Sequence, residues 1–216
     1  MRYPLIVFDW DGTLIDSTST IVWCIQEAAR TMGLPVPDHE RACHVIGLGL
    51  QDSLRFAVPD LSPGGYPDFV AAYRRNFLAR QDDMELFAGI RDLVAGLEAR
   101  GHRMAIATGK SRRGLDRSLE TTGLGRYMVA TRCADETNPK PHPAMLLELM
   151  EETGLGHDEL LMIGDTSHDL GMARSARVDA VAVSYGAHSA ESLRALSPRV
   201  CVASVAELDA WLTQNA

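Results

Sequence analysis

The most informative part of the sequence is Leu5-Ile6-Val7-Phe8-Asp9-Trp10-Asp11-Gly12-Thr13-Leu14. Its apolar run ends abruptly in two carboxylates one residue apart, and a glycine and a hydroxyl follow. Apolar side chains on both faces predict a central strand of a parallel sheet that helices cover on each side. The ligand crevice of such a sheet lies beyond the carboxyl ends of its strands. Asp9 and Asp11 are therefore expected at the crevice, with Gly12 allowing the backbone to turn.

Two acids held this close repel each other, so their pKa values tend to separate unless a cation lies between them. One acid can then remain ionised as a nucleophile or metal ligand while the other handles a proton. The alternative interpretation is a strand end followed by an ordinary Asp-Gly turn. That alternative accounts for Gly12 but gives no reason for Asp9 at the end of so apolar a run.

Length and composition limit the classes of protein to consider. The 216 residues suffice for one large domain, or for one domain with a smaller insert. The formal net charge of -8 argues against nucleic-acid binding, which normally needs a basic face. No apolar run reaches the length that crosses a bilayer, and the first residues do not form a signal peptide pattern. Four scattered cysteines without a C-x-x-C pair indicate buried free thiols and a cytoplasmic location.

Residues 16–84 are predicted to form an all-helical segment. Ile21, Ile25, Ala28 and Met32 recur at helical spacing, and Phe69, Tyr73 and Phe77 repeat the pattern further along. Residues 59–67, rich in proline and glycine, separate these helices. No convincing strand occurs in this segment.

From Phe87 onward, short apolar strands alternate with amphipathic helices. The expected strands, together with the first at 5–8, are 104–107, 127–130, 160–163, 180–183 and 200–203. This alternation predicts right-handed parallel crossovers. We therefore expect an α/β fold with a doubly wound parallel sheet, a Rossmann-like core of residues 1–15 and 85–216, and an inserted helical cap of residues 16–84.

Three apolar strands end in polar residues, which parallel strands bring to one edge of the sheet. These ends are Asp9-x-Asp11, Thr108-Gly109-Lys110 and Gly164-Asp165, and Lys140 lies in a loop with three prolines. Asp9 and Asp165 are suited to Mg²⁺, which takes one or two carboxylates together with substrate phosphate and water. Thr108, the Gly109 amide and Lys140 are suited to phosphoryl oxygens. The set of groups therefore favours phosphoryl transfer.

The same residues make the chain resemble the haloacid-dehalogenase-like (HAD) hydrolase superfamily, in its phosphoglycolate-phosphatase-like subgroup with a helical cap. The resemblance covers essentially the whole chain. It rests on four motifs in family order: Asp9-Trp10-Asp11-Gly12-Thr13, Thr108-Gly109, Lys140 in Lys-Pro-His-Pro, and Gly164-Asp165-Thr166-Ser167-His168-Asp169.

The resemblance implies a role for each matching residue. Asp9 is the nucleophile that forms an aspartyl-phosphate. Asp11 protonates the leaving alcohol, then activates water, and its backbone carbonyl joins the metal shell. Asp165 is a Mg²⁺ ligand, while Asp169 is either a ligand through water or an outer acid that orients Lys140. Thr108 and Lys140 bind the phosphoryl group. The dehalogenase branch of the superfamily lacks an acid at the position of Asp11. The presence of Asp11 in this chain therefore favours phosphate esters as substrates.

The helical segment resembles the family's cap, which closes over the site, expels water and contacts the leaving group. Gly12 and Gly109 join the substrate-binding set at the strand ends. Candidates for contacts with the leaving group are His44, Gly47, Lys110 and Arg112. For the run from Lys110 to Arg113, a solvated helix start is an equally good interpretation. His168 is not expected to bind zinc, because the sequence indicates no second nitrogen ligand near it.

The expected activity is hydrolysis of a small phosphorylated metabolite, such as phosphoglycolate or a sugar phosphate, by a monomer or homodimer. A sugar phosphomutase shares all four motifs, but helical-cap mutases carry a histidine soon after the first, and residues 17–23 contain none. Inorganic pyrophosphatase activity is a further alternative. A receiver module, a switch with a phospho-acceptor aspartate, is disfavoured by the large insert and by Asp11.

Overall fold

The computed structural model describes residues 2–216, apart from the side chain of Asp82. Six parallel strands form one sheet in the order β3-β2-β1-β4-β5-β6. They span β1 Leu5–Phe8, β2 Arg103–Thr108, β3 Met128–Cys133, β4 Leu160–Gly164, β5 Asp179–Val183 and β6 Val200–Val202. This order, which reverses beside β1, is that of the doubly wound Rossmann-like sheet. The predicted fold class and all six predicted strands are confirmed.

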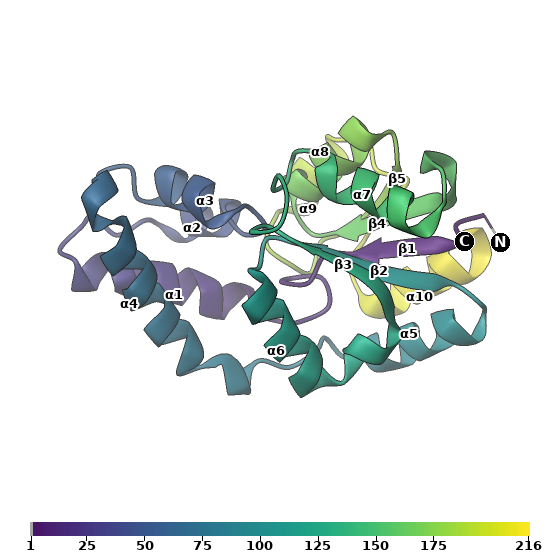
Figure 1. Ribbon diagram of the computed structural model, residues 1–216, viewed down its shortest axis with the longest axis horizontal. Helices are drawn as coiled ribbons and strands as arrows, with labels where there is room; N and C mark the ends of the chain where they lie inside the picture. The colour runs from purple at the N-terminus through teal and green to yellow at the C-terminus, as the bar shows by residue number, and fades with distance from the viewer. Residues whose placement is uncertain (1) are drawn as a thin grey trace.

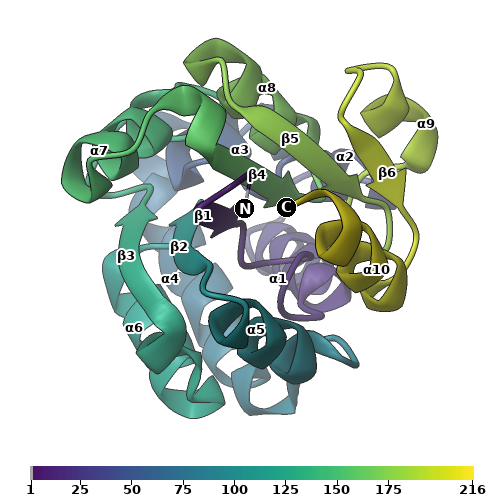
Figure 2. The same cartoon turned by 90° about the vertical axis from the view of Figure 1, so that its right-hand side faces the viewer.

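The sheet is covered by helices on both faces because the side chains of β1 alternate between two apolar clusters. Ile6 and Phe8 join the cluster on one face, and Leu5 and Val7 join the cluster on the other. Figure 2 shows the two helical layers on either side of the sheet. The first layer contains α5 Ile90–Ala99, α6 Arg112–Thr122 and α10 Val205–Asn215; the second contains α7 Ala144–Thr153, α8 Ser167–Ala176 and α9 Ala190–Arg194.

The helical insert between β1 and α5 lies to one side of the sheet (Figure 1). Its elements are α1 Thr18–Thr31, α2 His39–His44, α3 Leu50–Ala57, η1 Pro63–Gly65, α4 Tyr66–Leu78 and η2 Gln81–Asp83. Apolar residues of these helices, with Phe69 fully buried among them, form a cluster of their own. The insert therefore has a core separate from the two clusters that flank the sheet.

The two connections between the insert and the sheet run side by side. Ile15 forms an antiparallel bridge with Leu86, the Asp16 N–H donates to the Glu85 carbonyl at 2.9 Å, and the Phe87 N–H donates to the Leu14 carbonyl at 3.1 Å. The chain thus leaves and re-enters the sheet region at one place, immediately after the Asp9-x-Asp11 stretch.

The four cysteines are free thiols in the structure. Cys24, Cys43 and Cys133 are buried free thiols as predicted, whereas Cys201, also free, is only half-buried. Among residues 2–216, no helix is both long enough and apolar enough to cross a bilayer.

Candidate active site

The polar residues that end three strands meet where the strand order reverses. Asp9 follows the last residue of β1, Thr108 is the last residue of β2, and Asp165 follows the last residue of β4. β1 pairs with both β2 and β4, so these residues come from three adjacent strands. Asp9 and Asp165 have no exposed surface, and Thr108 is 1% exposed. The sheet thus brings together residues that lie far apart in the sequence.

Lys140 reaches this centre from the loop between β3 and α7. Its Nζ lies 2.7 Å from Asp9 Oδ1 and 2.6 Å from Asp169 Oδ1, and its side chain is fully buried. Although burial alone lowers a lysine pKa, the two carboxylates outweigh it and raise the pKa of Lys140 above its usual range. Lys140 is therefore an ammonium ion held between two acids.

Hydrogen bonds fix Asp165 and Asp169 in different ways. Asp165 accepts from Thr13 Oγ1 at 2.9 Å and from the Ala187 N–H at 2.7 Å. Asp169, in the first turn of α8, accepts from the N–H and Oγ1 of Thr166 through Oδ2 and turns Oδ1 toward Lys140. Of the two roles expected for Asp169, this contact favours the one that orients Lys140.

The carboxylates of Asp9, Asp165 and Asp169 fit a divalent cation. Each contributes an oxygen to a group whose members all lie within 4.8 Å of one another. Lys140 forms an ion pair with Asp9. No described residue, however, donates a hydrogen bond of good geometry to either oxygen of the Asp9 carboxylate. Three buried acids with one ammonium ion lack positive charge, and hard cations prefer oxygen ligands. These residues fit a divalent cation such as Mg²⁺.

The same crowding shifts the pKa values of the acids upward. Burial, opposed by Lys140 and reinforced by Asp169, raises the pKa of Asp9 to about 7. Burial and the nearby Asp9 and Asp169 raise the pKa of Asp165 well above its usual range. A bound cation would reverse both shifts by favouring the ionised forms.

Gly12 has to be glycine because it adopts φ +78° and lies against Asp165. A Cβ at this position would lie 2.1 Å from Asp165 Oδ2. We expect Gly12→Ala to displace Asp165 and to lower the free energy of unfolding by roughly 1–3 kcal/mol. Chemical denaturation measures this loss, and Gly33→Ala is the matched control, since Gly33 also has positive φ but nothing within 4 Å of its Cβ. An equal loss in both variants would contradict the proposed contact.

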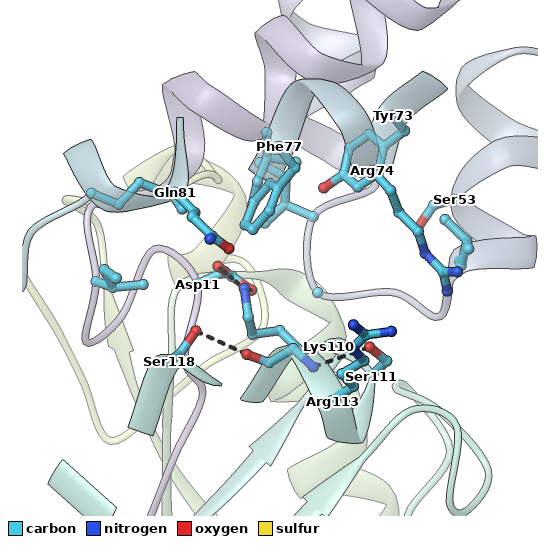
Figure 3. A pocket seen from close by; sticks show the side chains of 18 of the residues that line it. Asp11, Ser53, Tyr73, Arg74, Phe77, Gln81, Lys110, Ser111, Arg113 and Ser118 are labelled. Atoms are coloured by element: carbon cyan, nitrogen blue, oxygen red, sulfur yellow. Dashed lines mark hydrogen bonds and ion pairs between the residues drawn. The ribbon is translucent and has the colours of Figure 1, made fainter. Parts of the chain in front are cut away.

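Asp11 lies at the border between this centre and a cavity, and two partners hold its carboxylate. Ser17 Oγ donates to Oδ1 at 2.7 Å, and Lys110 Nζ donates to Oδ1 at 3.1 Å and to Oδ2 at 3.2 Å. Lys110 also lies 4.8 Å from the centre of the Phe77 ring of the insert. Figure 3 shows Asp11 and Lys110 together at the cavity wall. Lys110 is predicted near the substrate from the sequence, but its pairing with Asp11 and the hydrogen bond from Ser17 to Asp11 are not.

The loop after α2 brings the insert against the strand ends. A Cβ on Gly47 would lie 3.3 Å from Thr166 Oγ1 and 3.9 Å from Asp9 Oδ2. A Cβ on Gly109 would lie 2.6 Å from the Gly47 carbonyl oxygen, so these two backbones meet closely. The structure therefore places Gly47 and Gly109 at the centre, as the sequence predicts.

His44 is predicted from the sequence to contact the leaving group, but in the structure its ring does not line the cavity. His168 Nε2 and His188 Nε2 lie 2.7 and 3.3 Å from the His44 carbonyl oxygen. The Ser167 N–H donates to His188 Nδ1, which leaves the ring proton of His188 on Nε2. The three rings also lie within 5.3 Å of one another. The expectation of no second nitrogen ligand near His168 is therefore wrong.

This histidine cluster is nevertheless unsuited to zinc. Burial lowers the pKa of His168, and it lowers the pKa of His188 to about 4, so both rings are neutral near pH 7. Their converging Nε2 atoms carry protons that bond to the His44 carbonyl, whereas a metal needs a free lone pair. The cluster thus holds the end of α2 against α8 through hydrogen bonds.

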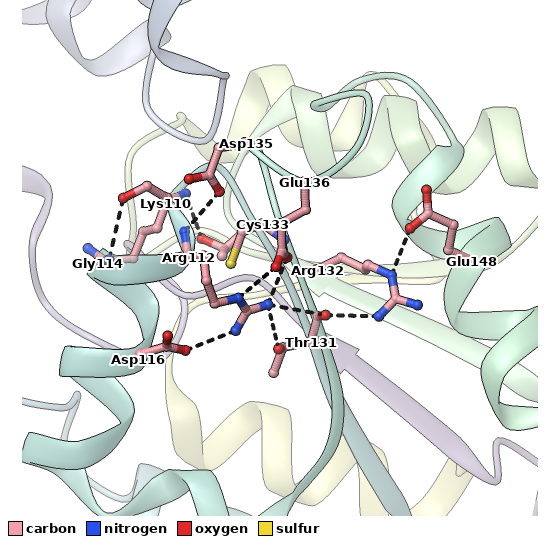
Figure 4. A network of polar contacts seen from close by, with 12 residues as sticks. Lys110, Arg112, Gly114, Asp116, Thr131, Arg132, Cys133, Asp135, Glu136 and Glu148 are labelled. Carbon is pink, nitrogen blue, oxygen red and sulfur yellow. Dashed lines mark hydrogen bonds and ion pairs between the residues drawn. The ribbon is translucent and has the colours of Figure 1, made fainter.

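Arg112 is a second correction, since its guanidinium group turns away from the cavity. It pairs with Glu136 at 2.8 Å and Asp116 at 3.1 Å, and it donates to Thr131 Oγ1 at 2.8 Å (Figure 4). These contacts connect α6 to the end of β3. The adjacent Arg113 lines the cavity instead.

The fold and this centre together define a Rossmann-like α/β enzyme with a helical insert and a lysine among buried carboxylates. Residues 6–183 match the model of the haloacid dehalogenase-like hydrolase family. The chain is 33% identical to "Probable phosphatase IndB" of Dickeya dadantii, over 95% of this chain and 91% of that protein. It is 28% identical to a phosphoglycolate phosphatase of Nitrosococcus oceani, over 98% and 97%. The crystal structure of a hydrolase from Pseudomonas syringae superposes with a TM-score of 0.90 at 21% identity and covers all of both chains.

The chain belongs to the haloacid dehalogenase-like hydrolase family. The extent of the family match and the identity to a full-length relative establish this membership. The resemblance inferred from the four motifs and the expectation of a hydrolytic enzyme are confirmed.

Proposed function

We propose that the chain is a Mg²⁺-dependent phosphatase that hydrolyses a small organic phosphate monoester through an aspartyl-phosphate on Asp9. As a phosphoric monoester hydrolase it belongs with the phosphatases among its relatives. The observation that carries the proposal is the environment of Asp9. This carboxylate is buried beside Lys140, its oxygens have no aligned hydrogen bond from a described residue, and Asp165 lies within reach of a shared cation.

In the first step, a carboxylate oxygen of Asp9 attacks phosphorus and the bond from phosphorus to the ester oxygen breaks. Asp11 gives its proton to the departing oxygen. Thr108, the Gly109 N–H and Lys140 hold the phosphoryl oxygens. Mg²⁺, when bound by Asp9 and Asp165, neutralises charge between the anionic nucleophile and the anionic substrate.

In the second step, water attacks the phosphorus of the aspartyl-phosphate, and Asp11 accepts a proton from that water. Inorganic phosphate leaves and the Asp9 carboxylate is restored. Ser17 and Lys110 hold the Asp11 carboxyl group beside the cavity, where a leaving group and later a water molecule can reach it.

Residues 16–84 act as a cap in this proposal, and residues 1–15 and 85–216 form the catalytic core. The separate apolar cluster of the insert and its two adjacent connections support this division. The contact of Gly47 with Gly109 supports a cap that closes over the phosphoryl group and excludes water.

Asp11→Asn is expected to lower kcat by roughly 10²–10⁴-fold, because the variant has no group to transfer the proton in either step. Steady-state phosphate release measures the loss. Asp16→Asn, which changes an exposed acid nearby, is the control and should keep the wild-type rate. Near-normal activity of Asp11→Asn would contradict the assigned role.

A phosphate-release screen with and without Mg²⁺ tests the proposed function. It compares phosphoglycolate, sugar phosphates, nucleotides, aryl phosphates and pyrophosphate. Mg²⁺-dependent release from monoesters supports the proposal, whereas release from pyrophosphate alone would contradict it. Trapping of a hexose bisphosphate would indicate a mutase, and lasting phosphorylation by acetyl phosphate without turnover would indicate a receiver.

The cytoplasmic location and the monomeric or homodimeric state stay predictions.

A further inference from the structure

A cavity of about 460 Å³ lies between the insert and the core, with Asp11 in its wall. Much of its lining is apolar, and the insert supplies most of this part: Ile21, Ile25, Leu54, Phe77 and Leu78. Cavities of this size enclose ligands as large as typical drugs, whereas a two-carbon acid such as glycolate would leave most of the volume empty. The cavity therefore fits a leaving group with a bulky apolar body.

The lining of the cavity has a net positive charge, although the net charge of the whole chain is negative. The net charge of the chain is -8, but the lining contains four basic residues and only two acids. Both acids already have partners, since Asp11 pairs with Lys110 and Asp135 accepts from the Arg112 N–H. An excess of positive charge therefore remains on the cavity wall.

Arg74 and Arg113 account for much of this excess. Arg74 comes from α4 of the insert and Arg113 from α6 of the core, so they approach from opposite walls. Neither forms an ion pair or a hydrogen bond with any side chain that the structure describes. In Figure 3 both side chains extend on the same side of the cavity. Two like charges directed at one space favour an anion there, and the planar guanidinium group suits carboxylate and phosphate equally.

We propose that the substrate is a phosphate monoester whose leaving group has an apolar body of ring size and carries a second anionic group. This inference rests on the proposed phosphatase function. The phosphoryl group lies at Asp9, the apolar body contacts the insert helices, and Arg74 and Arg113 bind the second anion. A carboxylate and a phosphate are the two forms that this anion can take.

The test compares the kcat/KM for phosphate release from five esters in the presence of Mg²⁺. Phenyl phosphate has the apolar body alone, and phosphoglycolate has the second charge alone. 4-Carboxyphenyl phosphate and benzene-1,4-diyl bisphosphate have both, and they distinguish carboxylate from phosphate. 4-Carbamoylphenyl phosphate is a neutral match for the carboxyl ester. We expect at least one of the two aryl esters with a second anionic group to have a kcat/KM about tenfold or more above the values for 4-carbamoylphenyl phosphate and phosphoglycolate.

Variants at the two arginines connect this preference to the cavity. Arg74→Met and Arg113→Met are each expected to reduce the ratio of kcat/KM for the preferred anionic ester to that for the carbamoyl ester about fivefold, since a charged pair at a partly exposed site contributes modestly. Arg75→Met is the matched control, because Arg75 is the next residue on α4 and does not line the cavity. This control should keep the wild-type ratio.

The outcomes separate this inference from the proposed function. Phosphate release from phenyl phosphate without any preference for a second anion would overturn the inference and leave the phosphatase proposal intact. A preference that Arg74→Met and Arg113→Met leave unchanged would also overturn it. Failure to release phosphate from any monoester would contradict the proposed function, and the inference would fail with it.

Discussion

Asp9→Asn is expected to abolish phosphate release, with kcat at least about 10⁴-fold lower than in the unchanged chain, because the amide cannot form the phosphoenzyme. The replacement is isosteric, and Asp9 lies in a fully buried position at the end of a strand that pairs on both sides. The fold should therefore persist. Phosphate release under saturating Mg²⁺ measures the effect, and residual activity within tenfold of the unchanged chain would contradict the role of Asp9.

The same substitution is expected to raise the melting temperature in the absence of divalent cations. Burial raises the pKa of Asp9 to about 7 in the folded chain, against 3.8 for an ordinary aspartate. Between these two values the folded state binds a proton that the unfolded state has lost, so stability falls as the pH rises from about 4 to about 7. The amide of the variant does not titrate in this range, and the gain should be largest above pH 7. Asp158→Asn, at an exposed position, is the control.

Mg²⁺ is expected to stabilise the chain strongly, and Asp165→Asn to remove this effect. A cation at 100 times its dissociation constant adds about 2.7 kcal/mol to the free energy of unfolding. For a chain of this length, that corresponds to a rise of roughly 5–10 °C in the melting temperature. Thermal denaturation with and without Mg²⁺ measures the shift in both chains. The control is again Asp158→Asn, which should retain the full shift.

The stabilisation by Mg²⁺ should also depend on pH in a defined direction. Below the raised pKa of Asp9, a proton competes with the cation for the same oxygens. The shift in melting temperature should therefore be larger at about pH 8 than at about pH 5.5, on either side of that pKa. An equal shift at both pH values, or an undiminished shift in Asp165→Asn, would indicate that the cation binds elsewhere.

The strands and the catalytic centre could be predicted because their signals are local. Each strand is a short apolar run, and the polar residue that follows it marks the edge of the sheet. Asp9, Thr108 and Asp165 are identified in this way, and the topology of parallel strands then brings them together. Lys140 was selected from its loop with three prolines, but nothing in that loop indicates that its side chain lies between Asp9 and Asp169.

Contacts between residues that lie far apart in the chain could not be predicted, because they depend on tertiary packing. The pairing of Lys110 with Asp11 joins residues 99 positions apart, and no pattern near either residue indicates it. The choice between Arg112 and Arg113 depends on one step of about 100° around α6, so a small error in where the helix begins reverses it. The convergence of His168 and His188 on His44 likewise depends on packing across the two units.

Rapid chemical quenching of the enzyme during turnover of a monoester labelled with ³²P tests whether Asp9 is the nucleophile. The proposal predicts label on the peptide that contains Asp9, in a linkage that hydroxylamine cleaves, as expected for an acyl phosphate. Asp11→Asn should accumulate more of this label, and Asp9→Asn should show none. Rapid release of phosphate with no labelled protein at any time, or label on another residue, would contradict the claim that Asp9 is the nucleophile.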